Sequence, residues 1–303
     1  MTLDFEVFEQ IADEKQCDIA FPIKEHFLIQ VIKQIIGQFH TEAGNLIFGG
    51  GTSLVCAYDE LTKRFSEDAD FRFVPCPKST KSIRADITNI IKNLKGFQLV
   101  GEPLSDSRKI EYHLIDTDNV IKKHSSLRPY IKIEVFFTDN LFYDPVLLPL
   151  QSFYDKETNS NKDDVKILCV ALEDTSIDKI SSFLWRIVSS TTEHSQYNPA
   201  DMRHLNDLVY LLPKLSIDKK FAKSLLSVFS EDVKYRLKQD ISLKAIVNQV
   251  MELLKTDKRF KSDYEQYVAN ISYAKTSDRY SFERACDVFH QYMNKIISIN
   301  CGE

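Results

Sequence analysis

The sequence contains no stretch that approaches the roughly 18 consecutive apolar residues needed to span a membrane. Its first residues are acidic, whereas a secretory signal begins with basic residues. Both absences argue against a membrane or exported protein, and we expect a protein of the cytoplasm. The 303 residues are enough to bury the cores of two domains.

Cysteine is sparse and dispersed. The six residues are Cys17, Cys56, Cys76, Cys169, Cys286 and Cys301. No two of them form a Cys-x-x-Cys pair, which argues against a zinc site and against a disulfide framework. The seven histidines show no metal-ligand spacing either. We therefore expect free thiols in a reducing compartment.

An excess of positive charge is also missing, since the formal net charge is -5. Proteins that bind nucleic acids in general are usually basic, so this class is disfavoured. Basic side chains do gather in one stretch, at Lys78, Lys81, Arg84, Lys92, Lys95, Arg108, Lys109, Lys122 and Lys123. A solvated surface is the favoured interpretation. If the substrate is RNA, these residues are the first candidates to bind it.

Helix and strand patterns alternate up to about residue 170, and helical patterns alone follow. We expect strands near residues 46–48, 70–74, 97–100, 108–115, 130–138 and 165–170. Helices are expected near 27–36 and 81–94 and, capped by Thr52, near 52–58, with a polar loop at 152–164. Later helices are expected near 175–190, 200–213, 217–230, 242–256, 260–273 and 279–298. The predicted fold class is α+β, with strands and flanking helices in residues 1–170 and a C-terminal α-helical bundle in residues 171–303.

A glycine-rich turn follows the first predicted strand, at Gly49-Gly50-Gly51-Thr52-Ser53. Between a strand and a helix, glycines let the backbone approach a phosphate closely and present N–H groups to it. Thr52 and Ser53 would add hydroxyl donors. The stretch lacks the further residues of a Walker A loop or a Rossmann fingerprint, so alone it fits an ordinary turn equally well.

Three carboxylates fall on predicted strands. Asp68 and Asp70 share a face, because side chains alternate along a strand, while Ala69 points into the core. Such a pair repels itself unless a cation lies between its members, and Mg²⁺ prefers hard oxygen ligands. Glu134 interrupts an apolar strand, and if that strand neighbours Asp70 the three residues can hold two metal ions for phosphoryl transfer. The alternatives are an acidic turn and a solvent-facing Glu134 beside Lys132.

Taken together, these elements resemble a known family. The chain resembles the AbiEii/AbiGii toxin nucleotidyltransferases, a family of the DNA-polymerase-β-like nucleotidyltransferase superfamily. The resemblance lies in two segments, Phe48-Gly49-Gly50-Gly51-Thr52-Ser53-Leu54 and Arg64-Phe65-Ser66-Glu67-Asp68-Ala69-Asp70-Phe71. The family pattern is Gly-Gly-Thr-x-Leu, a spacer, then Arg-x-Ser-x-Asp-Ile-Asp. The matching residues are Gly50, Gly51, Thr52, Arg64, Ser66, Asp68 and Asp70, and Ala69 replaces the usual isoleucine.

A third family element also has a counterpart. Members carry a lysine early in the first helix after the catalytic domain, which Lys179 matches, and Arg-Asp-x-x-Asp-Leu further on. Arg203 and Asp207 match that pattern, whereas His204 replaces its first aspartate. By resemblance, Lys179 would offset the charge of a triphosphate, and Asp207 would orient Lys179 or the nucleotide. The alternative is a surface salt bridge, and in either case Lys179→Ala is expected to leave the fold intact.

The resemblance implies a nucleotidyltransferase-type mixed β-sheet with flanking helices. It also implies an enzyme that transfers a nucleoside monophosphate from an NTP to a hydroxyl. The implied catalytic residues are Asp68, Asp70, Glu134, Lys179 and Asp207, with Mg²⁺ or Mn²⁺ held by Asp68, Asp70 and Glu134. The implied nucleotide-binding residues are Gly50, Gly51, Thr52, Ser53, Arg64, Ser66 and Lys179. Family members are toxins paired with an antitoxin, and some modify the 3′ end of tRNA. An RNA acceptor and a cognate antitoxin protein are therefore expected partners.

An alternative function uses the same scaffold without efficient transfer. The chain would then be an NTP-binding regulatory protein, or a protein whose helical half binds a partner. A missing catalytic carboxylate would mark this class, and the sequence retains Asp68, Asp70 and Glu134.

Overall fold

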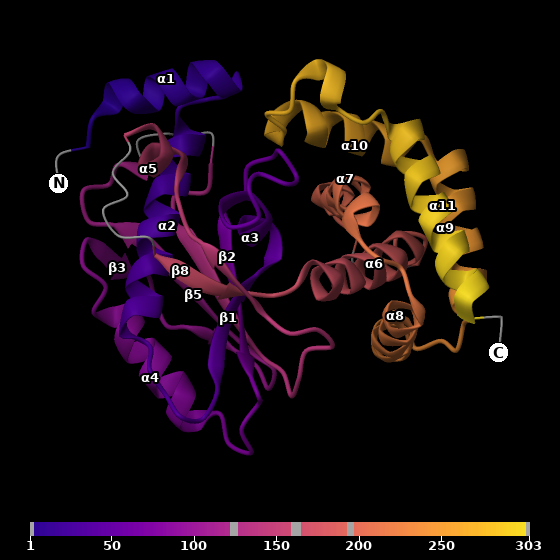
Figure 1. Cartoon of the computed structure of the whole chain (residues 1–303), viewed down its shortest axis with the longest axis horizontal. Helices are drawn as coiled ribbons and strands as arrows, with labels where there is room; N and C mark the ends of the chain where they lie inside the picture. The colour runs from indigo at the N-terminus through magenta and orange to yellow at the C-terminus, as the bar shows by residue number, and fades with distance from the viewer. Residues whose placement is uncertain (1–2, 122–126, 159–164, 193–196, 301–303) are drawn as a thin grey trace. The chain divides into compact units, whose positions relative to one another are not determined.

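The computed structural model describes residues 3–121, 127–158, 165–192 and 197–300. The chain divides into two compact units, Met1–Ala171 and Leu172–Glu303 (Figure 1). Lys122, Lys123 and Cys301 lie outside the described residues, and the other five cysteines are free. No helix in the described ranges is long and apolar enough to cross a membrane.

The first unit is built around a mixed β-sheet. Its strands are β1 (Asn45–Gly49), β2 (Asp68–Val74), β3 (Phe97–Leu99), β4 (Leu104–Ser105), β5 (Lys109–Asp116), β6 (Ile131–Phe137), β7 (Val146–Pro149) and β8 (Lys166–Cys169). They lie in the order β3-β5-β6-β2-β1-β8-β7, with β4 paired to β5. The β2–β6 and β1–β8 pairs are parallel and the other pairs are antiparallel. The mixed sheet predicted from the sequence is confirmed.

Side-chain alternation gives this sheet one apolar and one charged face. On β2, the buried residues Ala69, Phe71 and Phe73 alternate with the half-buried residues Asp68, Asp70 and Arg72. The helices of the unit are α1 (Phe5–Lys15), α2 (Ala20–Gln38), α3 (Gly50–Cys56), α4 (Lys81–Lys92) and α5 (Phe153–Glu157). Helices α2 and α4 contact each other and lie on the same side of the sheet (Figure 1).

The segment predicted as a loop at 152–164 is partly helical, because α5 occupies its first turns. Ser152 caps this helix: its hydroxyl accepts from the Asp155 N–H at 3.0 Å, and the Asp155 carboxylate accepts from the Ser152 N–H at 3.1 Å. The prediction was wrong because polar composition concealed this capping box. Residues 159–164 lie outside the described ranges.

Other helix starts also differ from the prediction. Helix α3 begins at Gly50, with Gly49 in the capping position, so Thr52 lies inside the first turn and does not cap it. Helix α2 begins at Ala20 and holds Pro22 in its first turn, where the missing N–H of proline has no cost. Helix α1, capped by the Asp4 carboxylate, and strand β7 were not predicted.

A buried glutamate on α2 makes the stability of the protein depend on pH. The Glu25 carboxylate accepts from the Phe153 N–H at 3.2 Å and from the Cys56 thiol at 3.4 Å. Burial raises the pKa of Glu25 to about 8, and these hydrogen bonds offset only part of the effect. In the unfolded chain, Glu25 releases this proton at about pH 4.3. Between these values the folded state binds more protons, so stability falls as pH rises through this range.

We expect Glu25→Gln to remove this loss, because glutamine is neutral at every pH. Its free energy of unfolding relative to the wild type should increase by roughly 3 kcal/mol between about pH 5 and about pH 8, measured by urea denaturation. Glu14→Gln, at an exposed position of α1, is the matched control and should show no such trend. A Glu25→Gln difference that does not vary with pH would contradict a protonated Glu25.

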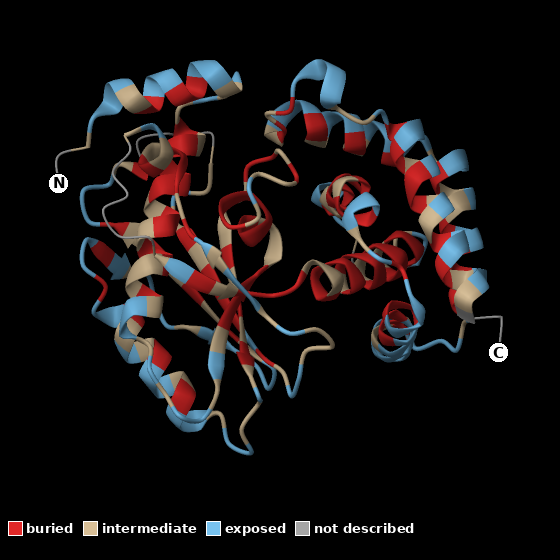
Figure 2. Ribbon diagram, viewed as in Figure 1, coloured by how far each residue is buried: buried red, intermediate tan, exposed pale blue. Residues whose placement is uncertain are grey.

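The second unit is built from helices, and its described residues include no β-strand. Its α-helices are α6 (Leu172–Ser189), α7 (Met202–Leu211), α8 (Lys219–Asp232), α9 (Leu243–Thr256), α10 (Lys258–Ile271) and α11 (Phe282–Asn300). Helix α6 is buried over most of its surface and contacts α7, α8 and α9. Its Phe183 ring packs edge-on against Phe289 of α11, with the centroids 5.2 Å apart. Helices α9, α10 and α11 bury one stripe and expose the opposite face, as Figure 2 shows. The predicted C-terminal helical region is confirmed.

Candidate active site

Three carboxylates lie on neighbouring strands of the first unit. The parallel pairing of β2 and β6 places Asp70 opposite Glu134, and Asp68 opposite Lys132. Asp68 and Asp70 alternate with the fully buried Ala69, so both lie on the charged face of the sheet. The condition under which the sequence brings the three carboxylates together, that the strand of Glu134 neighbours that of Asp70, is therefore met.

The glycine turn packs directly against Asp70. Strand β1 runs antiparallel to β2 and places Gly49 opposite Asp70. Gly50 has a φ of +70°, and a Cβ atom built there would lie 1.9 Å from Asp70 Oδ2. Any other residue would be strained in this backbone conformation and would collide with the carboxylate. Glycine thus allows the turn and the carboxylate to meet.

Arg64 and Ser66 support the next glycine of the turn. A Cβ atom on Gly51 would lie 2.3 Å from Arg64 Nη2 and 3.0 Å from Ser66 Oγ. Arg64 is buried, and its Nη1 donates to the backbone carbonyl of Phe65 at 2.8 Å. The Thr52 hydroxyl lies 2.9 Å from Ser66 Oγ and also contacts the backbone carbonyl of Asp68. The glycine element and the Arg-x-Ser-x-Asp element therefore form one packed group.

The hydroxyl groups of this turn contact the protein itself. Thr52 and Ser53 are both buried, and Ser53 Oγ donates to the Gly50 carbonyl at 3.0 Å. The sequence suggested these hydroxyls as phosphate donors. Their engagement within the turn leaves the backbone N–H groups as the better candidates for that role.

Basic side chains surround the carboxylates. Lys132 Nζ lies 2.6 Å from Glu134 Oε2 and 3.4 Å from Asp68 Oδ2. Lys109 Nζ lies 2.6 Å from Glu134 Oε1, and Arg128 Nη2 lies 2.7 Å from Asp68 Oδ1. Each oxygen of Glu134 therefore accepts from a lysine, and Lys132 contacts both Glu134 and Asp68.

These contacts determine the charge state of the site. Burial alone would raise the pKa of Glu134, but the hydrogen bonds from Lys109 and Lys132 outweigh burial and hold that pKa below its usual range. Burial likewise disfavours the charged form of Lys132, yet Asp68 and Glu134 raise its pKa. Glu134 is thus ionised at neutral pH, and its low pKa makes it a weak base.

A lysine of α2 also contacts the residues around Asp68. Lys24 is buried, and its Nζ donates to Glu67 Oε2 at 2.5 Å and to the Arg128 carbonyl at 2.8 Å. Burial lowers the pKa of Lys24, and the Glu67 carboxylate offsets part of this shift. Because Glu67 precedes Asp68 and Arg128 contacts it, Lys24 fixes both neighbours of that carboxylate.

The donor set fits a divalent metal at the two aspartates. Mg²⁺ in phosphoryl-transfer sites is commonly held by one or two carboxylates together with substrate phosphates. Asp68 and Asp70 offer two carboxylates on one face of β2. Among the residues that the structure describes, no three Asp, Glu, His or Cys side chains are grouped closely enough to hold a metal. Both oxygens of Glu134 accept from lysines, so it could become a third metal ligand only if Lys109 or Lys132 moved away from it.

In the second unit, Lys179 and Asp207 form a buried ion pair. Lys179 Nζ lies 2.6 Å from Asp207 Oδ2, joining α6 to α7. Both side chains are buried, so the interpretation as a surface salt bridge is wrong. One turn before Asp207, both ring nitrogens of His204 are buried without a hydrogen-bond partner among the described residues. Burial keeps the pKa of His204 well below its usual value, so the imidazole is neutral.

The basic stretch noted in the sequence does not form one solvated surface. Arg84 donates to Ser105 Oγ at 2.6 Å and to the Lys109 carbonyl at 3.0 Å, and its guanidinium lies 4.5 Å from the centroid of the Phe137 ring. Lys109 belongs to the carboxylate site. Lys78, Lys81, Lys92, Lys95 and Arg108 are exposed as predicted, whereas Arg84 and Lys109 are half-buried by these contacts.

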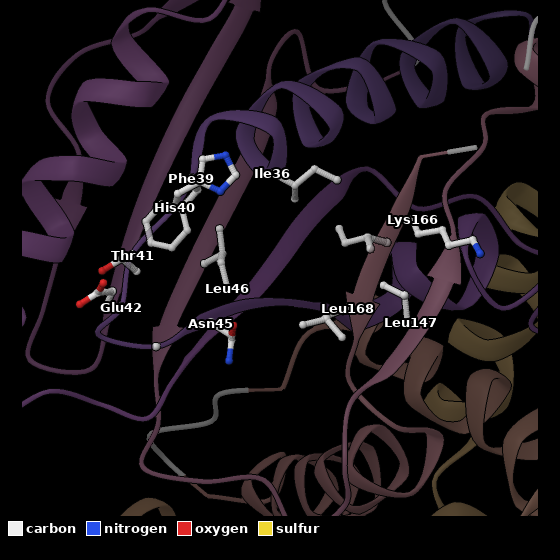
Figure 3. Close-up of a pocket in the computed structure, with 12 residues that line it drawn as sticks. Ile36, Phe39, His40, Thr41, Glu42, Asn45, Leu46, Leu147, Lys166 and Leu168 are labelled. Carbon is white, nitrogen blue, oxygen red and sulfur yellow. The ribbon is translucent and has the colours of Figure 1, made fainter. Parts of the chain in front are cut away.

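A pocket of about 610 Å³ lies elsewhere in the first unit (Figure 3). It is lined by the end of α2 and by parts of β1, β7 and β8, including Phe39, Leu46 and Lys166. Leu46 lies near the start of β1, whereas the glycine turn follows the end of that strand. No predicted site residue lines this pocket, so it is not part of the candidate active site.

Sequence reasoning missed the cations that hold the carboxylates. Lys24 and Arg128 are far from Asp68 in sequence, and only tertiary packing brings them to it. Lys132 was noted beside Glu134, since it precedes Glu134 by two residues on a strand and shares its face, but its ion pair with Glu134 was not predicted.

Comparisons with known proteins cover most of the chain. The model of a family described as nucleotidyl transferase AbiEii toxin, type IV toxin–antitoxin system, matches residues 36–288. The fold is similar to that of MenT4, a nucleotidyltransferase toxin from Mycobacterium tuberculosis H37Rv, with a TM-score of 0.58 and 14% identity over 98% of this chain and 99% of that chain. JHP933 from Helicobacter pylori matches with a TM-score of 0.45 and 14% identity, over 93% and 94% of the two chains. No curated protein matches the sequence.

Proposed function

Because the chain belongs to the AbiEii nucleotidyltransferase toxin family of type IV toxin–antitoxin systems, we propose that it transfers a nucleoside monophosphate from a metal-bound NTP to a hydroxyl of an RNA acceptor. Nucleotidyl transfer is the activity of the family, and the NTP, the metal and the acceptor are the proposed details. The observation that carries them is the packing of Gly50 against Asp70, beside Asp68 on the same strand face.

Each group of the packed turn has a proposed part in binding. Asp68 and Asp70 would hold Mg²⁺ or Mn²⁺ together with triphosphate oxygens. The bound ion would neutralise phosphate charge and activate the attacking hydroxyl. The backbone N–H groups of Gly50 and Gly51 would face the outer phosphates. Arg64 and Ser66 would contribute by keeping this turn in place, as their contacts with Gly51 support.

In the proposed reaction, the acceptor oxygen bonds to the α-phosphorus while the bond from that phosphorus to the bridging oxygen breaks. Pyrophosphate leaves with the bonding electron pair, and the hydroxyl proton passes to a nearby base or to water. Glu134 is the proposed third carboxylate. It can accept this proton or contact a metal once Lys109 or Lys132 turns from it toward a phosphate.

The second unit supplies the remaining proposed residues. Lys179 would balance triphosphate charge and Asp207 would orient its ammonium group, a role supported by the family pattern and by their 2.6 Å contact. The 3′ end of tRNA is the proposed acceptor, since some members of the family modify it. A cognate antitoxin is the proposed protein partner.

Incubation with each α-³²P-labelled NTP, Mg²⁺ and total tRNA tests this proposal. We expect one or more NTPs to label the RNA and to release pyrophosphate. EDTA should abolish labelling, because without a metal ion the two carboxylates would repel the phosphates. RNA labelling on a denaturing gel and released pyrophosphate are the two measurements.

A γ-³²P-labelled NTP is the matched control and should leave the RNA unlabelled. Label from the γ-position would mean phosphoryl transfer and contradict the proposed reaction. NTP binding without transfer to any RNA would favour the regulatory alternative.

A further inference from the structure

The charged face of the sheet continues beyond the carboxylates. Side chains on this face come from alternate residues of β2, β6 and β5. Two rows of paired residues cross it: Asp70, Glu134 and Glu111 in one, and Arg72, Phe136 and Lys109 in the next. An acidic row is thus followed by a row in which an aromatic ring lies between two basic residues.

Phe136 is exposed although it lies on a central strand. The side chain is 38% exposed, whereas its neighbours Val135 and Phe137 are buried. Lys109 Nζ lies 5.9 Å from the centroid of the ring, within cation–π range. The Tyr130 ring, in contrast, is already stacked on His113 with the centroids 4.3 Å apart. Packing of the core therefore does not explain a phenylalanine at position 136.

The surroundings of this ring suit a nucleotide. A nucleobase stacks on an aromatic side chain through its flat face, whichever base it is. Arg72 and Lys109 are paired with Phe136 from either side, so both are placed to offer positive charge to the adjoining phosphates. Lys109 contacts Glu134 at 2.6 Å and Glu111 at 3.2 Å, and it would reach a phosphate by turning from these carboxylates.

The direction of the strands distinguishes the acceptor from the incoming NTP. The glycine turn follows Gly49, which pairs with Asp70, whereas Phe136 pairs with Arg72 further along β2. Phe136 therefore lies on the side of Asp70 away from the turn that would hold the triphosphate. In phosphoryl transfer the attacking and leaving oxygens are roughly in line, so the acceptor enters opposite the leaving pyrophosphate.

We propose that Phe136 stacks on a base at the single-stranded 3′ end of the RNA acceptor, with Arg72 and Lys109 beside the adjoining phosphates. This inference rests on the proposed nucleotidyl transfer to RNA. It assigns a binding role to a residue outside the carboxylate and glycine elements. The subsite selects a single-stranded end rather than a particular base, because stacking tolerates every base.

Fluorescence anisotropy with a labelled single-stranded RNA tests the subsite directly on the full chain, without NTP. Phe136→Leu should weaken RNA binding by a factor of about 5–100, the range expected when one stacked base is lost. Phe136→Trp should retain binding, because indole also stacks. Phe5→Leu is the matched control, since Phe5 is 44% exposed on α1 and should not affect RNA binding.

Two further measurements separate the acceptor from the nucleotide. In the transfer assay, Phe136→Leu should raise the acceptor KM and leave kcat nearly unchanged at saturating RNA. Its affinity for a fluorescent NTP analogue should equal that of the wild type. Unchanged RNA affinity in Phe136→Leu, or a loss of NTP affinity in its place, would overturn the stacking role.

The two proposals fail in different ways. A wild-type protein that labels no RNA would contradict the proposed function, whatever Phe136 does. A wild type that labels RNA, with a Phe136→Leu variant of unchanged RNA affinity, would remove only the stacking subsite.

Discussion

Asp70→Asn is expected to lower the rate of nucleotide transfer by a factor on the order of 10²–10⁴, because a metal ligand that stabilises transition-state charge is worth several kcal/mol. The carboxylate lies against Gly50 and opposite Glu134, at the centre of the site. Asparagine keeps the shape of the side chain, so the fit against Gly50 is preserved. The measurements are steady-state transfer and calorimetric titration with NTP, each with and without Mg²⁺.

Mg²⁺ should strengthen NTP binding to the wild type but not to Asp70→Asn. Asp86→Asn, an exposed position on α4, is the matched control and should behave as the wild type. The midpoint of thermal unfolding should change little in either variant. Equal NTP affinity in wild type and Asp70→Asn, with and without metal, would remove Asp70 from the metal site.

Local sequence rules predicted the part of the site that local structure builds. The Asp68-Ala69-Asp70 spacing fixes two carboxylates on one strand face, whatever the rest of the chain does. Gly50 adopts a positive φ between a strand and a helix, where such a residue is expected. Most strands and the later helices also followed from short-range periodicity, whereas the mixed pairing of the sheet was expected from the family resemblance.

What the sequence could not predict depends on long-range packing. Strand register decides that Glu134 meets Asp70, and no local pattern encodes register between distant strands. The same packing brings Lys109 and Lys132 onto Glu134. Glu134 was expected to be a metal ligand, and in the structure it is paired with these two lysines. The burial of Lys24 was also not predicted, because lysine is usually a surface residue, yet this side chain is almost fully buried.

Lys179→Ala is expected to destabilise the protein by about 3–5 kcal/mol, because it leaves the buried Asp207 carboxylate without this cation. From the sequence we expected this variant to leave the fold intact, and the burial of the pair is the reason to expect a loss of stability instead. Lys261→Ala is the matched control. Lys261 also lies 2.6 Å from a carboxylate, that of Glu283, but both side chains are exposed, and its loss should leave the free energy of unfolding close to that of the wild type. Urea denaturation of the full chain measures both values.

The double variant Lys179→Met/Asp207→Leu separates the structural from the catalytic role of the pair. Replacing a buried ion pair with apolar side chains of similar volume is often neutral or stabilising, so its stability should return to within about 1 kcal/mol of the wild type. Transfer should stay reduced by a factor on the order of 10² or more, because no ammonium group remains to balance the triphosphate. Lys179→Ala alone would lose both stability and transfer and could not distinguish these causes. A stable double variant with wild-type transfer would show that the pair only joins α6 to α7, and the family role proposed for Lys179 and Asp207 would be wrong for this chain.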